Sequence, residues 1–252
     1  MSWLYDLRNI RKTRKSGNVV FELHIPEFQV RFGEFVAVLG PSGCGKSTLL
    51  DLLALVLRPD ETGKAVFRFA PSLAPSDEAD ISSCWRSRKE KEIAAIRRRH
   101  IGYVLQTGGL LPFLSVGSNI ALTCRLNGIS NIENRVNTIA ERLGIREQLS
   151  KKPQFLSGGQ RQRVAIARAM VHQPAVVLAD EPTAAVDRER AKVIVEQFNQ
   201  LAKEKKIGIV MVTHDQKLVE MAADRKMTFK MDHGSENGME KTISTMFEGF
   251  EE

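Results

Sequence analysis

The sequence is short of cysteine, of secretion signals and of long apolar runs, and each shortage excludes a class of protein. Its three cysteines are odd in number and lack metal-ligand spacing, so we expect neither a disulfide framework nor a cysteine metal site. Apolar runs such as Val176 to Ala179 are far shorter than the ~20 residues of a membrane-spanning helix. The N-terminus has no basic region followed by an apolar core, which argues against a secretory signal. We therefore expect a protein of a reducing compartment that does not itself cross a membrane.

Charge is unevenly distributed along the chain. The formal net charge is +7, and basic residues gather near the N-terminus and again between Arg86 and Arg99. Such runs can contact nucleic acid or an anionic membrane, but we favour a solvated face that also attracts a polyanionic nucleotide. From Asp232 to Glu252 there are six acids and one lysine, which predicts a weakly structured acidic tail over residues 231–252.

Four apolar runs predict the strands of a parallel sheet that is buried on both faces. They are Phe35–Leu39, Ile101–Leu105, Val176–Ala179 and Ile209–Val212. Polar motif residues follow the end of each run, and ligands of open α/β sheets collect at the carboxyl ends of the strands. We therefore predict an α/β fold with a binding site along one edge of the sheet.

The segment between the second and third predicted strands has a different pattern. Apolar residues recur there at helical spacing up to a glycine stop: Val136, Ile139, Ala140, Leu143 and Gly144. We expect residues 107–172 to form a helical lobe inserted into a sheet lobe of residues 1–106 and 173–230. Ile194–Leu201 predicts a further amphipathic helix that covers the sheet, and residues 58–85 a loop-rich hairpin and connection.

A glycine-rich loop follows the first predicted strand: Gly40-Pro41-Ser42-Gly43-Cys44-Gly45-Lys46-Ser47-Thr48. Its glycines let backbone N–H groups turn inward around phosphates, at the positive end of the following helix. Lys46 adds a point charge between the β- and γ-phosphates, Ser47 offers a hydroxyl to Mg²⁺, and Thr48 can bond a phosphate oxygen. An ordinary glycine-rich turn is the weaker alternative, because the buried strand and the Lys-Ser pair stand where phosphate binding needs them.

Two adjacent acids end the third predicted strand. The Asp180 carboxylate would emerge beside the Mg²⁺ site and hold the ion through its water shell. Glu181 would orient or deprotonate the water that attacks the γ-phosphate. A strand end capped by solvated charge is the alternative for such a pair, and the glycine-rich loop upstream argues against it.

Three further segments fit the same chemistry. Gln106 directly follows the second strand, where its amide oxygen can reach the metal or the attacking water. His214 follows the fourth strand, where an imidazole can bond the γ-phosphate and hold Glu181 in line. The segment Ser157-Gly158-Gly159-Gln160 opens a predicted helix with Ser157 as N-cap, which is a ready anion site in the helical lobe.

In their order along the chain, these motifs resemble the nucleotide-binding subunit of an ABC transporter over about residues 1–230. The resemblance implies a P-loop ATPase with Mg·ATP as substrate, a mainly parallel sheet core, a small antiparallel β region and the inserted helical lobe. It assigns catalysis to Lys46, Glu181 and His214, and metal contact to Ser47, Gln106 and Asp180. It also implies that Ser157 to Gln160 close over the nucleotide of the opposite subunit in a head-to-tail dimer. Asp187, in the D-loop segment Ala184-Ala185-Val186-Asp187, would lie at the dimer interface or act only as a helix N-cap.

The stretch Arg97–Gln106, followed by Leu110-Leu111-Pro112, further resembles the branch of lipoprotein-release, macrolide-export and cell-division ATPases. This implies a homodimer or paired ATPase subunit, cytoplasmic and peripheral on the inner face of the cell membrane. It would dock near Gln106–Pro112 on a separate transmembrane permease. The family stacks an aromatic ring on adenine, and the register here places Arg14 at that position, with Tyr5 or Phe21 as alternatives.

Two other functions are alternatives to transport. One is a mechanotransmission ATPase that regulates an extracytoplasmic enzyme through a membrane partner. The other is a soluble ABC ATPase acting on nucleic acid, which the basic runs allow. The sequence shows neither the second nucleotide domain of ribosomal members nor the coiled-coil insertion of DNA-repair members, so we do not expect a nucleic-acid partner.

Overall fold

The computed structural model describes residues 3–184, 186–220, 222–236 and 239–249, which contain one ten-stranded sheet. Its strand order is β5-β4-β1-β2-β10-β9-β3-β8-β7-β6. The strands are β1 (Trp3–Ser16), β2 (Val19–Arg31), β3 (Phe35–Leu39), β4 (Val66–Phe69), β5 (Ala79–Asp80), β6 (Ile101–Val104), β7 (Val176–Asp180), β8 (Gly208–Thr213), β9 (Arg225–Glu236) and β10 (Met239–Glu248). The four predicted strands correspond to β3, β6, β7 and β8, and they are mutually parallel.

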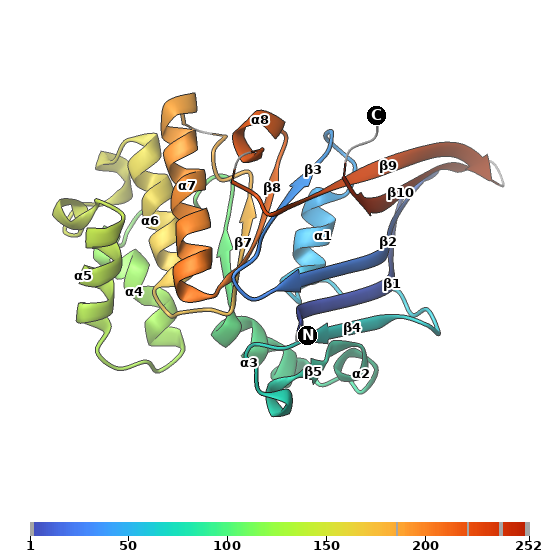
Figure 1. Ribbon diagram of the computed structural model, residues 1–252, viewed down its shortest axis with the longest axis horizontal. Helices are drawn as coiled ribbons and strands as arrows, with labels where there is room; N and C mark the ends of the chain where they lie inside the picture. Colours follow the sequence, from blue (N-terminus) through green and yellow to red (C-terminus); the bar gives the residue numbers. More distant parts are fainter. Residues whose placement is uncertain (1–2, 185, 221, 237–238, 250–252) are drawn as a thin grey trace.

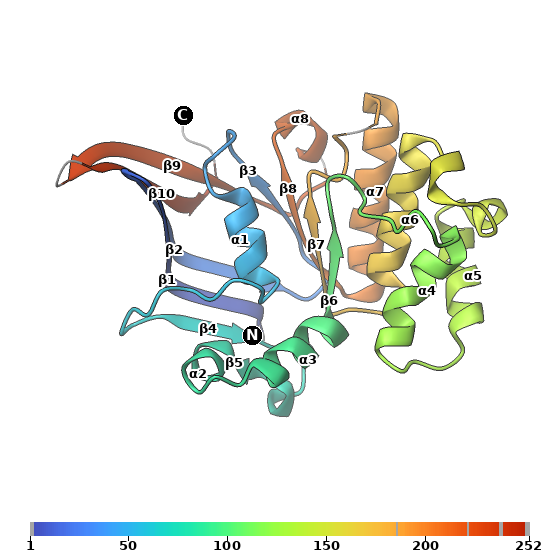
Figure 2. The ribbon, with the colours of Figure 1, turned by 180° about the vertical axis from the view of Figure 1, so that it is seen from behind.

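The helices are α1 (Lys46–Leu53), α2 (Ile81–Arg86), α3 (Glu90–His100), α4 (Val116–Leu126), α5 (Ile132–Arg142), α6 (Gly158–Met170), α7 (Arg188–Lys205) and α8 (Gln216–Val219). Short 3₁₀ turns cover Pro75–Asp77, Arg146–Gln148 and Pro153–Phe155. The helices α4, α5 and α6 lie between β6 and β7 in the sequence, where a helical segment was predicted, and α7 contains the predicted amphipathic helix. Figures 1 and 2 show the helices α4 to α7 gathered at one end of the molecule and the long strands β1, β2, β9 and β10 at the other.

The parallel strands separate two hydrophobic cores. On β3, Phe35 and Ala37 face a core shared with α4 to α7, whereas Val36 and Val38 face a core shared with α1, β1 and β2. All four side chains are fully buried. Burial on both faces explains why these strands read as continuous apolar runs, and the confirmed fold is α/β with an antiparallel region.

The expectation of a weakly structured acidic tail is wrong for the described part of that segment. The strands β9 and β10 form an antiparallel hairpin, and β10 also runs parallel to β2 from Glu240, opposite Val19, to Thr245, opposite His24. Acid content is a poor guide here because one face of β10 is buried, with Ser244 and Met246 at most 2% exposed. Residues 237–238 and 250–252 of the predicted tail lie outside the described residues.

The segment before α3 is only partly a loop. The strands β4 and β5 pair antiparallel, as the predicted hairpin requires, but α2 follows them and was not foreseen. Its Trp85 is partly buried and packs against the core on the α1 side of the sheet.

Candidate functional site

A cavity of about 640 Å³ opens at the carboxyl ends of the parallel strands. Motif residues from four separate segments line it: Ser42, Gly43, Gly45, Lys46, Ser47, Thr48, Gln106, Asp180, Glu181 and His214. Parallel strands end at the same edge of the sheet, so residues far apart in the sequence meet there. The structure therefore brings together the side chains that the sequence placed at strand ends.

The glycine-rich loop wraps around the Lys46 ammonium. Its Nζ donates to the carbonyls of Gly40 and Pro41, at 2.7 Å each. Gly43 and Gly45 have φ of 84° and 104°, in the left-handed region that favours glycine, and Gly45 is the N-cap of α1. The loop thus presents the N-terminus of α1 and a lysine to one cavity, which is the arrangement that binds phosphates.

Three of the predicted nucleotide-binding residues are part of the glycine-rich loop but are not among the described residues that line the cavity. They are Gly40, Pro41 and Cys44. Cys44 is fully buried, and a Cβ at Gly40 would lie 2.6 Å from its Sγ. Burial also raises the pKa of the Cys44 thiol. The Cys44 side chain therefore packs beneath the loop, away from the cavity.

Two further acidic side chains lie close enough to Asp180 to affect its charge. Burial, followed by the charges of Glu181 and Asp51, raises the pKa of Asp180, while Lys46 and a hydrogen bond with Ser47 oppose the rise. Asp51 lies one turn after Ser47 on α1 and was missed in the sequence. Its spacing of four residues from the Mg²⁺-ligand candidate was the available signal.

Glu181 lies between the other two polar motif residues. Its Oε1 is 3.2 Å from Nδ1 of His214, and its Oε2 accepts from Nε2 of Gln106 at 3.4 Å. Its φ of 41° is unusual for a non-glycine residue, and its backbone N–H donates to the Val212 carbonyl at 3.0 Å. Strained backbone of this kind is typical of functional positions, where surrounding structure holds it.

The segment Ser157–Gln160 begins α6 through a capping box. The Ser157 Oγ accepts from the Gln160 N–H at 3.3 Å, and the Ser157 N–H donates to Gln160 Oε1 at 2.9 Å. Ser157 is thus an N-cap, as predicted. None of the four residues is among those described as lining the cavity, so the structure does not bring this segment to the phosphate loop of its own chain.

Asp187 is also an N-cap, since its Oδ1 accepts from the Arg190 N–H at 3.0 Å. The preceding segment borders a groove of about 410 Å³ that shares Glu181 and His214 with the main cavity and includes Val186. Ala185 of the predicted D-loop lies outside the described residues. The groove connects the start of α7 to the acidic end of β7.

Two of the three candidates for base contact line the cavity. Arg14 and Phe21 are cross-strand neighbours on β1 and β2, and both border it. The Arg14 Nη2 is 3.5 Å from Oδ2 of Asp51. Tyr5 is fully buried, and its hydroxyl donates to the Leu53 carbonyl at 2.6 Å, so it cannot stack on a base.

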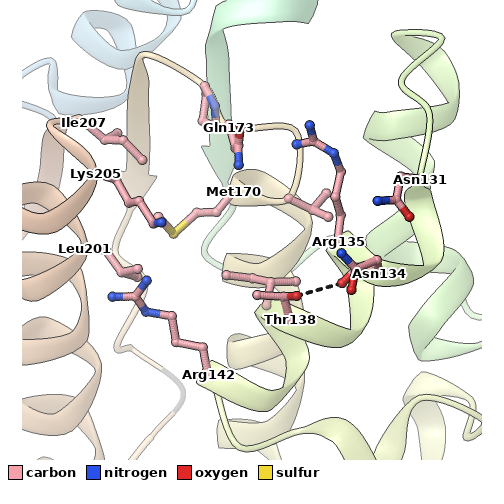
Figure 3. A pocket seen from close by; sticks show the side chains of 13 residues that line it. Asn131, Asn134, Arg135, Thr138, Arg142, Met170, Gln173, Leu201, Lys205 and Ile207 are labelled. Atoms are coloured by element: carbon pink, nitrogen blue, oxygen red, sulfur yellow. Dashed lines mark hydrogen bonds between the residues drawn. The ribbon is translucent and has the colours of Figure 1, made fainter.

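A second cavity, of about 520 Å³, lies at the C-terminal ends of α6 and α7. Figure 3 shows Arg135 of α5 on one side of it and Lys205 of α7 on the other, with the Arg142 side chain of α5 reaching across towards Leu201. It contains none of the motif residues, so it adds nothing to the site described above.

The residues present fit a magnesium ion. The candidate ligands Ser47, Gln106 and Asp180 offer oxygen atoms, which Mg²⁺ prefers, and burial, followed by the charges of Glu181 and Asp51, raises the pKa of Asp180. Within the described ranges, no group of three His, Cys, Asp or Glu side chains forms a metal site. In Mg²⁺ sites of nucleotide hydrolases a few protein ligands share the ion with substrate phosphates and water.

A glycine-rich phosphate loop, a lysine within it and two acids at the end of another parallel strand define a P-loop nucleotide hydrolase. The family model described as ABC transporter matches residues 23–184. The chain therefore belongs to the ABC transporter family, as an ATP-binding and ATP-hydrolysing subunit.

Relatives define the type of subunit. The lipoprotein-releasing system ATP-binding protein LolD of Legionella pneumophila is 37% identical over 190 residues, which cover 75% of this chain and 78% of LolD. The macrolide export ATP-binding/permease protein MacB of Syntrophobacter fumaroxidans is 35% identical over 87% of this chain, which spans 29% of that longer protein. The chain is an ATPase subunit of the LolD and MacB type.

A solved structure supports the same assignment. The dimeric post-hydrolysis ATP-binding cassette MJ0796, bound to ADP and Pi, has a TM-score of 0.73 and 30% identity, covering 89% of this chain and 93% of its own. Within the described ranges of the present chain, no helix combines the length and apolarity needed to cross a membrane.

Proposed function

We propose that the main cavity binds Mg·ATP and hydrolyses it, with its residues in the roles that the motifs suggest. The loop from Gly40 to Thr48 holds the β- and γ-phosphates through its backbone, and Lys46 places its charge between them. Ser47, Gln106 and Asp180 hold the magnesium ion, which would neutralise phosphate charge when bound. Arg14 and Phe21 contact the base.

Hydrolysis is assigned to Glu181 on one observation: it lies between Gln106 and His214 at the mouth of the phosphate cavity. From this position its carboxylate orients and deprotonates the water that attacks the γ-phosphate. His214 contacts the γ-phosphate and keeps Glu181 aligned with that water, and Gln106 contacts the water or the metal. Two contacts limit the freedom of Glu181 before reaction.

The site is completed by a second subunit. The segment Ser157–Gln160 exposes the N-terminus of α6 in the helical lobe, away from the cavity of its own chain. In a head-to-tail dimer it covers the γ-phosphate of the opposite chain, and Asp187 lies at the interface. The dimeric MJ0796 cassette supports this arrangement.

The working partner is a separate transmembrane permease, and the chain acts on the cytoplasmic face of the membrane. The predicted docking segment Gln106–Pro112 is flanked by exposed apolar side chains, with Phe113 69% and Leu105 44% exposed. The MacB relative is an ATP-binding/permease protein, which supports pairing with a permease. Recovery of the tagged chain from solubilised membranes should yield a stoichiometric polytopic protein, whereas recovery with ribosomes or alone would contradict this partner.

The catalytic assignment is tested with two variants. Glu181→Gln should leave ATP binding intact, lower kcat at least 100-fold and accumulate an ATP-bound dimer, because the base for the attacking water is lost. Lys46→Ala should weaken nucleotide binding itself. Near-normal hydrolysis by Glu181→Gln would overturn the role given to Glu181, and unchanged ATP affinity of Lys46→Ala would overturn the phosphate site.

A further inference from the structure

The C-terminal hairpin, formed by β9 and β10, contacts the phosphate loop. Ser244 of β10 is fully buried, and its hydroxyl donates to the backbone carbonyl of Cys44 at 2.6 Å. The two residues are 200 positions apart. This is a polar contact between the end of the chain and the loop that binds phosphate.

The Cys44 carbonyl needs such a partner because of the loop's own geometry. A loop that turns its N–H groups inward around phosphates turns carbonyls outward, into the protein. Cys44 is fully buried, and a buried carbonyl without a hydrogen bond is costly. The Ser244 hydroxyl supplies the bond at the centre of the loop, between Gly43 and Gly45, where the backbone has the most conformational freedom.

The surroundings of this bond are apolar and closely packed. A Cβ at Gly45 would lie 3.1 Å from Leu23 and from Phe21, and a Cβ at Gly40 would lie 3.3 Å from Phe229. These side chains come from β2 and β9, the two neighbours of β10 in the sheet. The serine side chain is short enough to fit among these apolar groups. Its hydrogen bond constrains the orientation of the Cys44 carbonyl, which apolar contacts do not do.

The register of β10 fixes where the hydroxyl points. Ser244 is opposite Leu23 of β2 and opposite Met231 of β9, so two strands hold its backbone. The bond therefore joins a flexible glycine-rich loop to a rigid, doubly paired strand.

We propose that Ser244 is a positioning residue for ATP binding: through the Cys44 carbonyl it holds the phosphate loop in the conformation that receives the β- and γ-phosphates. This inference rests on the proposed function of the cavity and adds a residue that does not touch the nucleotide. Because the bond acts on the loop and not on Glu181, its loss should affect nucleotide affinity more than the chemical step.

Ser244→Ala is the direct test, since it removes only the hydroxyl. The KM for ATP and the Kd for ATP, the latter measured in a Glu181→Gln background, should rise about three- to tenfold, the effect of losing one hydrogen bond. The kcat should stay within about twofold. Ser244→Cys, which keeps the size but is a weaker donor, should lie between wild type and Ser244→Ala. Ser235→Ala, an exposed hydroxyl on β9, should match wild type.

Amide hydrogen exchange of the nucleotide-free protein separates positioning from general loss of structure. In Ser244→Ala, exchange should accelerate in residues 40–48 and stay unchanged in α4 to α6. A KM within twofold of wild type, or a uniform acceleration across the sheet, would overturn the proposal. If wild type itself bound no ATP, the function proposed for the cavity would fail instead, so wild type and Lys46→Ala are measured alongside.

Discussion

The surroundings of Asp180 in the cavity disfavour the ionised form of its carboxyl group. Burial, followed by the charges of Glu181 and Asp51, raises the pKa of Asp180 above its ordinary value of 3.8. The folded chain therefore binds a proton on Asp180 more tightly than the unfolded chain does, so ionisation of this carboxyl costs stability. That cost is absent below the pKa of the unfolded chain and grows as the pH rises through the raised folded value. Repulsion between these carboxylates destabilises the nucleotide-free protein, and a bound cation would offset it.

Asp180→Asn should therefore stabilise the nucleotide-free protein while removing the metal ligand. We expect its melting temperature near pH 7.5 to rise by about 1–3 °C, a small change because Asp180 is only half buried and solvent screens its charge. The difference from wild type should shrink as the pH falls below about 4, where Asp180 becomes protonated in the folded and the unfolded chain alike. Thermal unfolding across this pH range measures it, with the exposed Asp232→Asn as control. A lower melting temperature near pH 7.5 would contradict the charge argument.

The sequence predicted the cavity residues well because each belongs to a short local motif at the end of an apolar run. Glu181 and His214 are 33 positions apart, yet both follow parallel strands, so their meeting needed only the strand prediction. The base contact was less certain, because the choice among Arg14, Tyr5 and Phe21 depends on which side chain the core buries. Ser244 gave no signal at all, since a serine between threonine and isoleucine resembles any strand residue.

Among the elements, α6 joins the signature segment, which is Ser157–Gln160, to the segment that follows Gln106. Near its C-terminal end, the Arg168 guanidinium donates to the carbonyls of Gly108 and Gly109, at 2.8 and 2.7 Å. The Arg168 carbonyl in turn accepts from Thr123 Oγ1 of α4 at 3.0 Å. One side chain therefore ties the α6 helix to the stretch between β6 and α4, and burial lowers its pKa.

Arg168→Lys keeps a positive charge but cannot form two parallel hydrogen bonds in fixed geometry. We expect a loss of about 1–2 kcal/mol in the free energy of unfolding, because one buried carbonyl is left without a donor. Urea denaturation measures the loss, and hydrogen exchange should accelerate in residues 106–111. Arg163→Lys is the matched control on the same helix, since Arg163 bonds one carbonyl, that of Leu143, at 3.2 Å. Equal losses in the two variants would contradict the special role of Arg168.

The hairpin of β9 and β10, like α2, is an element that sequence reasoning missed. Its position depends on pairing between β10 and β2, which are more than 200 residues apart, and nothing local reports such a contact. The buried face of β10 also holds Ser244, while Ile243 and Phe247 are partly exposed, so apolar and buried positions do not coincide. Composition then favoured an acidic tail, although side chains on exposed strand faces are commonly charged.

At the scale of the whole molecule, the two parts of the proposed ATP site lie apart within one chain. The phosphate loop and Glu181 lie at the carboxyl edge of the sheet, whereas Ser157 is exposed at the start of α6 and is not among the described residues lining the cavity. A helix N-terminus exposed in this way can stabilise phosphate charge only on another molecule. The arrangement therefore predicts that activity depends on pairs of chains.

Mixing two inactive variants tests this dependence. Lys46→Ala removes the phosphate site, and Ser157→Arg blocks the signature segment at a cost of about 1 kcal/mol in helix capping. Each homodimer should be inactive, but a mixed dimer contains one intact site, built from the unchanged phosphate loop of one chain and the unchanged signature of the other. Equal, freely exchanging amounts give half mixed dimers, so ATPase activity should recover to about a quarter of wild type if sites act independently. Activity that stays at the level of the separate variants, in mixtures shown to exchange subunits, would mean that the two segments do not share a site across chains.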